Sequence, residues 1–280
     1  LQLVLPDVSD NVKRLKCNDC LDILMNVYKT HKDDMEPSAI RSLSSCLAEI
    51  LLVQEANTEL WESGIVKRAF SLLLSFCMQD NGKVRHHVQD EIMRLLQFHY
   101  ERSFPVSSRQ VIRQLDILCK SFNEDDFHDV INFLVFITKS CLILHGDVYP
   151  NLFSLLLKVL FSSSFTVIRQ HRCTLVDYRT LRPIEVILDS DRFVDDAVID
   201  STFQALQALA PQVTDNEKDV AEYYIVLLQI SRHYLQQQHE HGEELFVATT
   251  RKVLECFASA NAALHKTLSI YLISFYASLS

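Results

Sequence analysis

Glycine and proline are scarce in this sequence, which has 4 glycines and 6 prolines among its 280 residues. Average usage would give a chain of this length about 20 glycines and about 14 prolines. Because tight turns and sheet connections use these two residue types, their scarcity favours long helices joined by short connections. Glycine-rich loops that hold phosphate groups are nearly excluded, and no GxGxxG, P-loop or GxSxG motif occurs.

The sequence also lacks an excess of positive charge and a long unbroken apolar run. With 27 basic and 36 acidic side chains, its formal net charge is −9, which makes it a poor autonomous binder of nucleic acid or of anionic membranes. The longest apolar segment, residues 130–144, is interrupted by Asn132, Thr138, Lys139 and Ser140 and is too short to span a bilayer. We therefore expect no membrane segment, and we expect any phosphate contact to come from a local basic patch.

Cysteines are present but are not arranged as a metal or redox site. Cys17 and Cys20 form a CxxC pair that is predicted to lie inside a helix, with no strand before it and no second pair at zinc-ligand spacing. Most of the other cysteines fall in leucine-rich helical segments, which is typical of small core residues in a reducing compartment such as the nucleus or cytosol. The full set is Cys17, Cys20, Cys46, Cys77, Cys119, Cys141, Cys173 and Cys256.

Apolar residues recur at helical spacing, most clearly between Trp61 and Leu96. One apolar helix is followed by the break Asp80–Lys83, whose Gly82 tolerates the left-handed conformation, and then by a second helix. Two helices joined by a tight turn, the second opening with Lys-Val-Arg, form the unit of a HEAT-type solenoid. The apolar stripe of the second helix is predicted to consist of Val84, Val88, Ile92, Leu95 and Leu96.

Similar patterns before and after this hairpin predict further helix pairs. A helix from Ser9 or Asp10 to about Tyr28 and another from about Glu36 precede it. The first is expected to turn Val12, Leu15, Leu21, Leu24 and Met25 inward, and the second Ile40, Leu43, Leu47, Ile50 and Leu51.

We predict an all-α, HEAT-type α-solenoid of roughly five helix pairs plus a terminal helix. Residues 1–162 form N-terminal HEAT-like repeats, 163–194 an irregular insertion or crossover, and 195–280 continuing repeats. Within the insertion, Ile184, Val186 and Ile187 are compatible with a short strand or an extended loop edge. The sequence begins with Leu1 rather than Met, so we expect a fragment of a longer solenoid.

Motifs for catalysis or metal binding are weak. The close histidine pairs, His86 with His87 and His239 with His241, lack the HExxH spacing that places two imidazoles on one helix face. An acidic cluster does not follow the EF-hand order of ligands, and it is explained by charges at a helix N-terminus or by an acidic patch for a basic partner. We predict no enzyme, no cofactor, no metal site and no small-molecule substrate. The cluster is Asp189, Asp191, Asp195, Asp196 and Asp200.

A group of basic residues is the best candidate for a contact with a partner. For Arg85, the structural alternative is an ion pair with acids of a neighbouring repeat, and for Lys67, Lys83 and His86 it is a solvated helix face. The functional hypothesis is contact with RNA phosphates or with an acidic partner. The candidate residues are Lys67, Arg68, Lys83, Arg85, His86 and His87.

The stretch from about Leu47 to Leu96 has a characteristic order of segments. They are Leu51–Gln54, Trp61, the helix Leu72–Phe76, and Lys83–Arg85 followed by Val88, Gln89 and Ile92. Ser108–Leu118, Val148–Leu160 and Thr202–Leu206 continue the same order further on. In this order the sequence resembles the N-terminal region of the ribosomal RNA processing protein 12 family, which are HEAT-repeat ribosome-assembly factors.

The resemblance implies a non-enzymatic scaffold of small-subunit precursors, with a role in ribosome maturation and nuclear export. It implies pre-ribosomal proteins as partners, with rRNA phosphates reached through a local basic patch. It also implies location in the nucleolus and nucleus, with shuttling to the cytoplasm. An acidic solenoid fits basic proteins better than naked RNA. Two alternatives stay open: an importin-like transport receptor, which would bind the small GTPase Ran and Phe-Gly nucleoporin repeats, and another HEAT-repeat protein-interaction scaffold.

Overall fold

The computed structural model describes residues 4–54, 61, 64–120, 127–161, 183, 186–187, 190, 217–236, 242–259 and 262–277. Every regular element in these ranges is helical and none is a strand, which confirms the all-α prediction. No helix among them is both long enough and apolar enough to cross a membrane. The chain divides into two compact units, Leu1–Leu155 and Leu156–Ser280.

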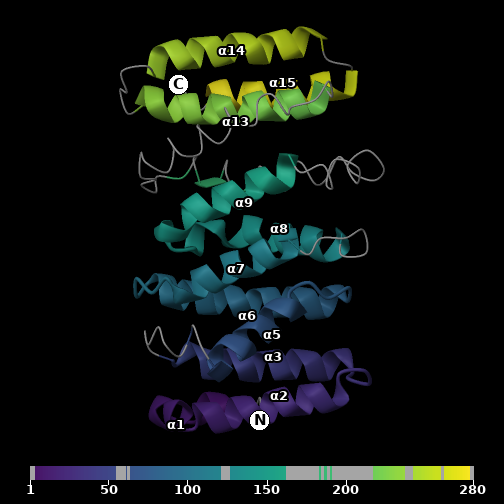
Figure 1. Cartoon of the computed structure of the whole chain (residues 1–280), viewed down its shortest axis with the longest axis vertical. Helices are drawn as coiled ribbons and strands as arrows, with labels where there is room; N and C mark the ends of the chain where they lie inside the picture. The colour runs from purple at the N-terminus through teal and green to yellow at the C-terminus, as the bar shows by residue number, and fades with distance from the viewer. Residues whose placement is uncertain are drawn as a thin grey trace. The chain divides into compact units, whose positions relative to one another are not determined.

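The first unit is a succession of short-linked helices, which Figure 1 shows in chain order. They are η1 (Leu5–Asp7), α1 (Asp10–Leu15), α2 (Cys17–His31), α3 (Pro37–Leu52), α5 (Gly64–Phe76), α6 (Gly82–Tyr100), α7 (Val106–Lys120), α8 (Phe127–Ser140), η2 (Cys141–Ile143), η3 (Gly146–Val148) and the beginning of α9 (Tyr149–Phe161).

These helices form two layers. In one layer α2 packs on α5 and α5 packs on α7, and in the other α3 packs on α6 and α6 packs on α8. Contacts also join α2 to α3, α5 to α6, and α7 to α8. Each consecutive pair therefore contributes one helix to each layer and stacks on the next pair, as expected for HEAT repeats.

The core lies where the two layers meet, and the predicted apolar stripes supply it. Val84, Val88, Ile92, Leu95 and Leu96 of α6 are all at most 1% exposed. Burying one such side chain contributes about 1.5–3 kcal/mol relative to leaving it in water. The stripe of α3 is likewise buried at Leu43, Leu47, Ile50 and Leu51, while Ile40 is half-buried.

The turn between α5 and α6 is held by side chains rather than by a glycine. Asn81 caps α6 by accepting hydrogen bonds from the backbone N–H groups of Lys83 and Val84 at 3.0 and 3.3 Å. Gly82 is already helical, so its tolerance of the left-handed conformation is not used in this turn. The left-handed glycine is Gly64, at φ +76°, where α5 begins.

Four successive carbonyl groups in the same turn accept hydrogen bonds from side chains. The carbonyl of Cys77 accepts from Gln89 of α6 at 3.3 Å, and that of Met78 accepts from Asn132 of α8 at 3.2 Å. The next two accept from the guanidinium of Arg85. These carbonyls have lost their helical partners, so the side chains satisfy groups that would otherwise be costly to leave unpaired.

The helix predicted from residue 10 to about Tyr28 is broken at Lys16 into α1 and α2. Leu21 and Leu24 of α2 are buried as expected, and Met25 is half-buried. Val12 and Leu15 are 49% and 81% exposed, so their predicted inward orientation is wrong. The six residues of α1 instead turn Lys13 inward, because this lysine pairs with Glu49 of α3.

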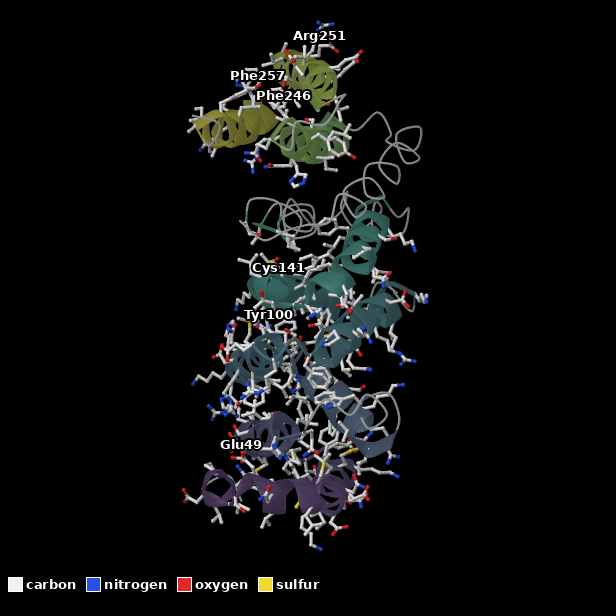
Figure 2. All side chains as sticks on the ribbon, turned by 90° about the vertical axis from the view of Figure 1, so that its left-hand side faces the viewer. Glu49, Tyr100, Cys141, Phe246, Arg251 and Phe257 are labelled. Atoms are coloured by element: carbon white, nitrogen blue, oxygen red, sulfur yellow. The ribbon has the colours of Figure 1, made fainter. Side chains whose placement is uncertain are left out.

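The second unit contains α13 (Glu217–Gln236), α14 (Gly242–Ser259) and α15 (Ala262–Ala277). Leu228, Val253 and Leu272, one from each helix, form its core, and Phe246 and Phe257 pack against them (Figure 2). The predicted boundaries at 162–163 and 194–195 fall outside the described residues, as does most of the predicted insertion. Within it, Val186 and Ile187 have helical backbone, so a strand is not formed there.

Candidate functional site

The six basic residues predicted from the sequence do not form one patch. Lys67 and Arg68 lie near the beginning of α5, whereas Lys83 and His86 lie at the beginning of α6, after the turn. Arg68 is about 12 Å along the helix axis from Phe76, the last residue of α5. Lys83, His86 and Arg68 are exposed and Lys67 is half-buried.

Arg85 has a structural role. Its guanidinium donates to the carbonyls of Gln79 and Asp80 at 2.7 and 3.1 Å. Among the described residues Arg85 forms no ion pair with an acid of a neighbouring repeat, and its Nη1 instead donates within its own turn. Through these two bonds Arg85 ties the start of α6 to the turn that follows α5.

A different set of residues forms the ion-pair ladder between repeats. Arg94 of α6 contacts Glu49 of α3 at 2.6 Å and Glu91 of its own helix at 2.9 Å. Glu49 also lies 3.5 Å from the ammonium of Lys13 (Figure 2 labels Glu49). Burial alone would lower the pKa of Arg94, but its hydrogen bonds and charge interactions with Glu49 and Glu91 raise it. Arg94 therefore stays cationic at any pH at which the chain is folded.

His87 belongs to the same ladder. Its Nε2 lies 2.9 Å from the hydroxyl of Ser45, which in turn donates to Glu91 at 2.7 Å. Together with Glu49, Asp90 and other residues, it lines a hollow of about 360 Å³ on the α3–α6 side. Since most of its charged groups already pair with one another, we assign this hollow a structural role.

A second hollow, of about 340 Å³, lies on the α2–α5 side. Lys29 and Lys32 from the end of α2 and Arg68 from α5 line it, with Asp22 as its one acidic residue. All four side chains are exposed, and the described part of the chain provides no hydrogen bond or ion pair to any of them. Met25, Asn26, Tyr28 and Leu72 complete the lining. We call this the α2–α5 hollow.

The sequence analysis missed Lys29 and Lys32. They lie three residues apart on one face of α2, which is visible in the sequence. Their association with Arg68 is not visible in the sequence, because it depends on the packing of α2 against α5, and α3 separates these two helices along the chain. The structure therefore separates Arg68 from Lys83 and His86 and groups it with two lysines of the preceding repeat.

The CxxC pair is unsuited to redox chemistry. The break at Lys16 places Cys17 in the first turn of α2 rather than inside a longer helix, which corrects the prediction. Burial nevertheless raises the pKa of Cys17 to about 11, with a smaller contribution from Cys20, so the thiol stays protonated. Among the residues described, no group of three or more His, Cys, Asp or Glu side chains is arranged to hold a metal ion.

The first unit thus consists of stacked helix pairs. An ion-pair ladder joins the pairs on one side, and the basic α2–α5 hollow lies on the other. The sequence of residues 1–124 matches the family of RRP12-like, N-terminal HEAT repeats. Over this segment the chain is similar to that family. No curated protein matches the chain.

The RRP12-like region runs from the N-terminus through α7, so both hollows lie inside it. The resemblance between Leu47 and Leu96, and at Ser108–Leu118, is confirmed. The segments Val148–Leu160 and Thr202–Leu206 lie beyond the matched residues and stay predictions. RRP12-like HEAT repeats indicate a scaffold for ribosome biogenesis, a type of protein that is generally non-enzymatic.

The predicted His239–His241 pair and the acidic cluster between Asp189 and Asp200 lie outside the described residues. Neither contributes to the sites above. Of the two hollows described above, the α2–α5 hollow is the one whose charged side chains form no hydrogen bond or ion pair within the described residues, and it is the candidate for contact with a partner.

Proposed function

We propose that the chain is a non-enzymatic α-solenoid scaffold that binds small-subunit ribosomal precursors and supports their maturation and nuclear export. The observation that supports this is the match of residues 1–124 to RRP12-like, N-terminal HEAT repeats. Stacked helix pairs suit this role because they present an extended surface whose shape does not depend on a ligand. The protein would reside in the nucleolus and nucleus and shuttle to the cytoplasm.

Its main partners in this proposal are pre-ribosomal proteins, with rRNA phosphates as a secondary contact. The net charge of −9 disfavours extended contact with RNA. Lys83 and His86 are exposed at the start of α6 and are available to a phosphate group, but they do not continue into a basic stripe with Lys67 and Arg68.

Sedimentation tests this function. The full-length protein, tagged in its own cells, is run on a sucrose gradient after a salt wash, and the fractions are probed for precursor rRNA. We expect co-migration with small-subunit precursors that survives the wash, and loss of the heavy peak after nuclease treatment of the extract. Recovery only in light fractions free of precursor rRNA would contradict the proposal.

The same tagged protein can be used to distinguish a scaffold from the alternative, a transport receptor. An importin-like protein would bind GTP-loaded Ran and Phe-Gly nucleoporin repeats directly, without stable association with precursor particles. Binding to both, together with a light sedimentation profile, would replace the scaffold by a carrier.

A further inference from the structure

The α2–α5 hollow concentrates positive charge in an acidic chain. Lys29, Lys32 and Arg68 face a single carboxylate, that of Asp22, while the whole chain has a formal net charge of −9. An exposed lysine on a helix can pair with an acid three or four residues away, as Lys16 does with Asp19 at 3.2 Å. Within the described residues these three cations have no such partner.

Helix electrostatics explain only part of this arrangement. Lys29 and Lys32 lie at the C-terminal end of α2, where the helix dipole favours a cation. Arg68 is the fifth residue of α5, beyond the first turn in which the helix dipole acts, so the dipole does not account for its position. The hollow thus brings together three cations from two repeats, an arrangement that favours an external negative charge.

The lining of the hollow is also partly apolar. Met25, Tyr28 and Leu72 are half-buried and lie among the cations. A volume of about 340 Å³ accommodates a few side chains and is near the lower end of the range for ligand pockets, about 300–1,000 Å³. Such a mixture suits a chain that offers carboxylates next to apolar side chains.

We propose that the α2–α5 hollow binds an acidic peptide segment of a partner protein, with its carboxylates on Lys29, Lys32 and Arg68 and an apolar side chain against Leu72 and Met25. RNA fits less well, because phosphate-backbone binding uses a continuous basic track, whereas the chain has a formal net charge of −9 and Lys83 and His86 lie beyond the far end of α5. This inference names a partner class for one surface of the proposed scaffold and rests on that function.

Fluorescence anisotropy on the purified 280-residue chain tests the inference. The probe is a fluorescein-labelled 12-residue peptide of repeating Asp-Glu-Phe, and its matched control replaces each Asp and Glu by Asn and Gln. We expect saturable, salt-sensitive binding of the acidic peptide only. The hollow variant, Lys32→Glu with Arg68→Glu, should weaken this binding by about tenfold or more, because each reversal replaces an attraction by a repulsion.

The control variant is Lys83→Glu with Arg113→Glu. It makes the same change in net charge at two exposed side chains outside the hollow and should alter the affinity by no more than about twofold. Circular dichroism melting of both variants checks that each is folded.

Three results would overturn the inference. One is the absence of saturable peptide binding up to about 1 mM, the limit of weak specific affinity. Another is equal weakening by the two variants. The last is binding of a 12-nucleotide single-stranded RNA that the hollow variant abolishes while the peptide does not bind, which would assign the hollow to RNA. Because the probes are synthetic, these outcomes are independent of whether the chain joins precursor particles.

Discussion

His99 is a histidine kept neutral by its surroundings. Its ring is 1% exposed and packs edge-on against Trp61 and Phe104, with ring centroids 5.1 and 4.8 Å away. Nδ1 lies 2.9 Å from the hydroxyl of Ser107, and buried Nε2 has no partner among the described residues. Burial, helped by the nearby charge of Arg102, lowers the pKa of His99 from 6.5 to about 4.

Acidification should therefore destabilise the fold at this point. In the unfolded chain His99 becomes protonated below its ordinary pKa of 6.5. In the folded chain it becomes protonated only near pH 4. Stability is thus fully present above pH 6.5 and is lost as the pH falls. The loss from this group is about 2 kcal/mol between about pH 7 and about pH 5.

Urea unfolding at these two pH values measures the effect. Trp61 is the only tryptophan in the chain and touches His99, so its fluorescence reports unfolding at this site. In a His99→Phe variant the pH-dependent loss should be smaller by about 2 kcal/mol. Equal losses in the variant and the wild type would show that His99 does not titrate in this way.

At the scale of elements, α14 begins with a glycine because another helix passes too close for a side chain. A Cβ at Gly242 would lie 2.8 Å from the carbonyl carbon and oxygen of Tyr234 in α13. Real Cβ atoms do not approach backbone so closely, and neither backbone can move without separating α13 from α14. The two helices pack closely along their length.

A Gly242→Ala substitution should therefore destabilise the second unit by about 1–3 kcal/mol. Hydrogen exchange measured by mass spectrometry should show faster exchange in α13 and α14 and no change in α3 or α6. Gly146→Ala is the matched control, because a Cβ there meets no atom within 4 Å. Unchanged exchange in α13 of the Gly242→Ala variant would contradict the close approach.

The sequence predicted correctly those helix faces that depend only on the spacing of nearby apolar residues. The α6 stripe from Val84 to Leu96 follows from the helical period alone, and the structure buries all of it. The α1 stripe was wrong because a break at Lys16 rotates Val12 and Leu15 away from the face that contains Leu21 and Leu24. Periodicity cannot detect such a break, since no proline or glycine marks it.

The candidate site was less predictable than the fold. Arg68 was identified, but the group to which it belongs includes Lys29 and Lys32 from an earlier repeat. Arg85 was assigned to acids, whereas its partners are carbonyls released by the end of α5. Both cases depend on contacts between helices that are distant in the sequence, and a single sequence contains no direct record of these contacts.

At the scale of the whole molecule, the buried thiols show how well the core of the first unit excludes solvent. Cys17, Cys46, Cys77 and Cys141 are each at most 5% exposed. Burial raises the pKa of Cys77 to about 12 and also raises the pKa of Cys46. The thiolate is the reactive form, so these groups should be nearly inert in the folded chain.

Alkylation by iodoacetamide followed by peptide mapping tests this expectation. In the native protein these four cysteines should be labelled more slowly than Cys20, which is half-exposed. All eight cysteines should be labelled rapidly in denaturant. Fast labelling of Cys77 in the native protein would mean that the first unit opens readily between α5 and α6.

The turn after α5 has a mechanical consequence for a scaffold. Its carbonyls are tied to α6 through Gln89 and Arg85 and to α8 through Asn132, and Lys139 of α8 also donates to Gln89 at 3.2 Å. Apolar surfaces can slide over one another and keep their contact, whereas a hydrogen bond is lost within about 1 Å of extension. When a force acts on the repeats, these hydrogen bonds should hold the turn, α6 and α8 in a fixed relative position. Such a joint should therefore bend less than a joint held by apolar contact alone.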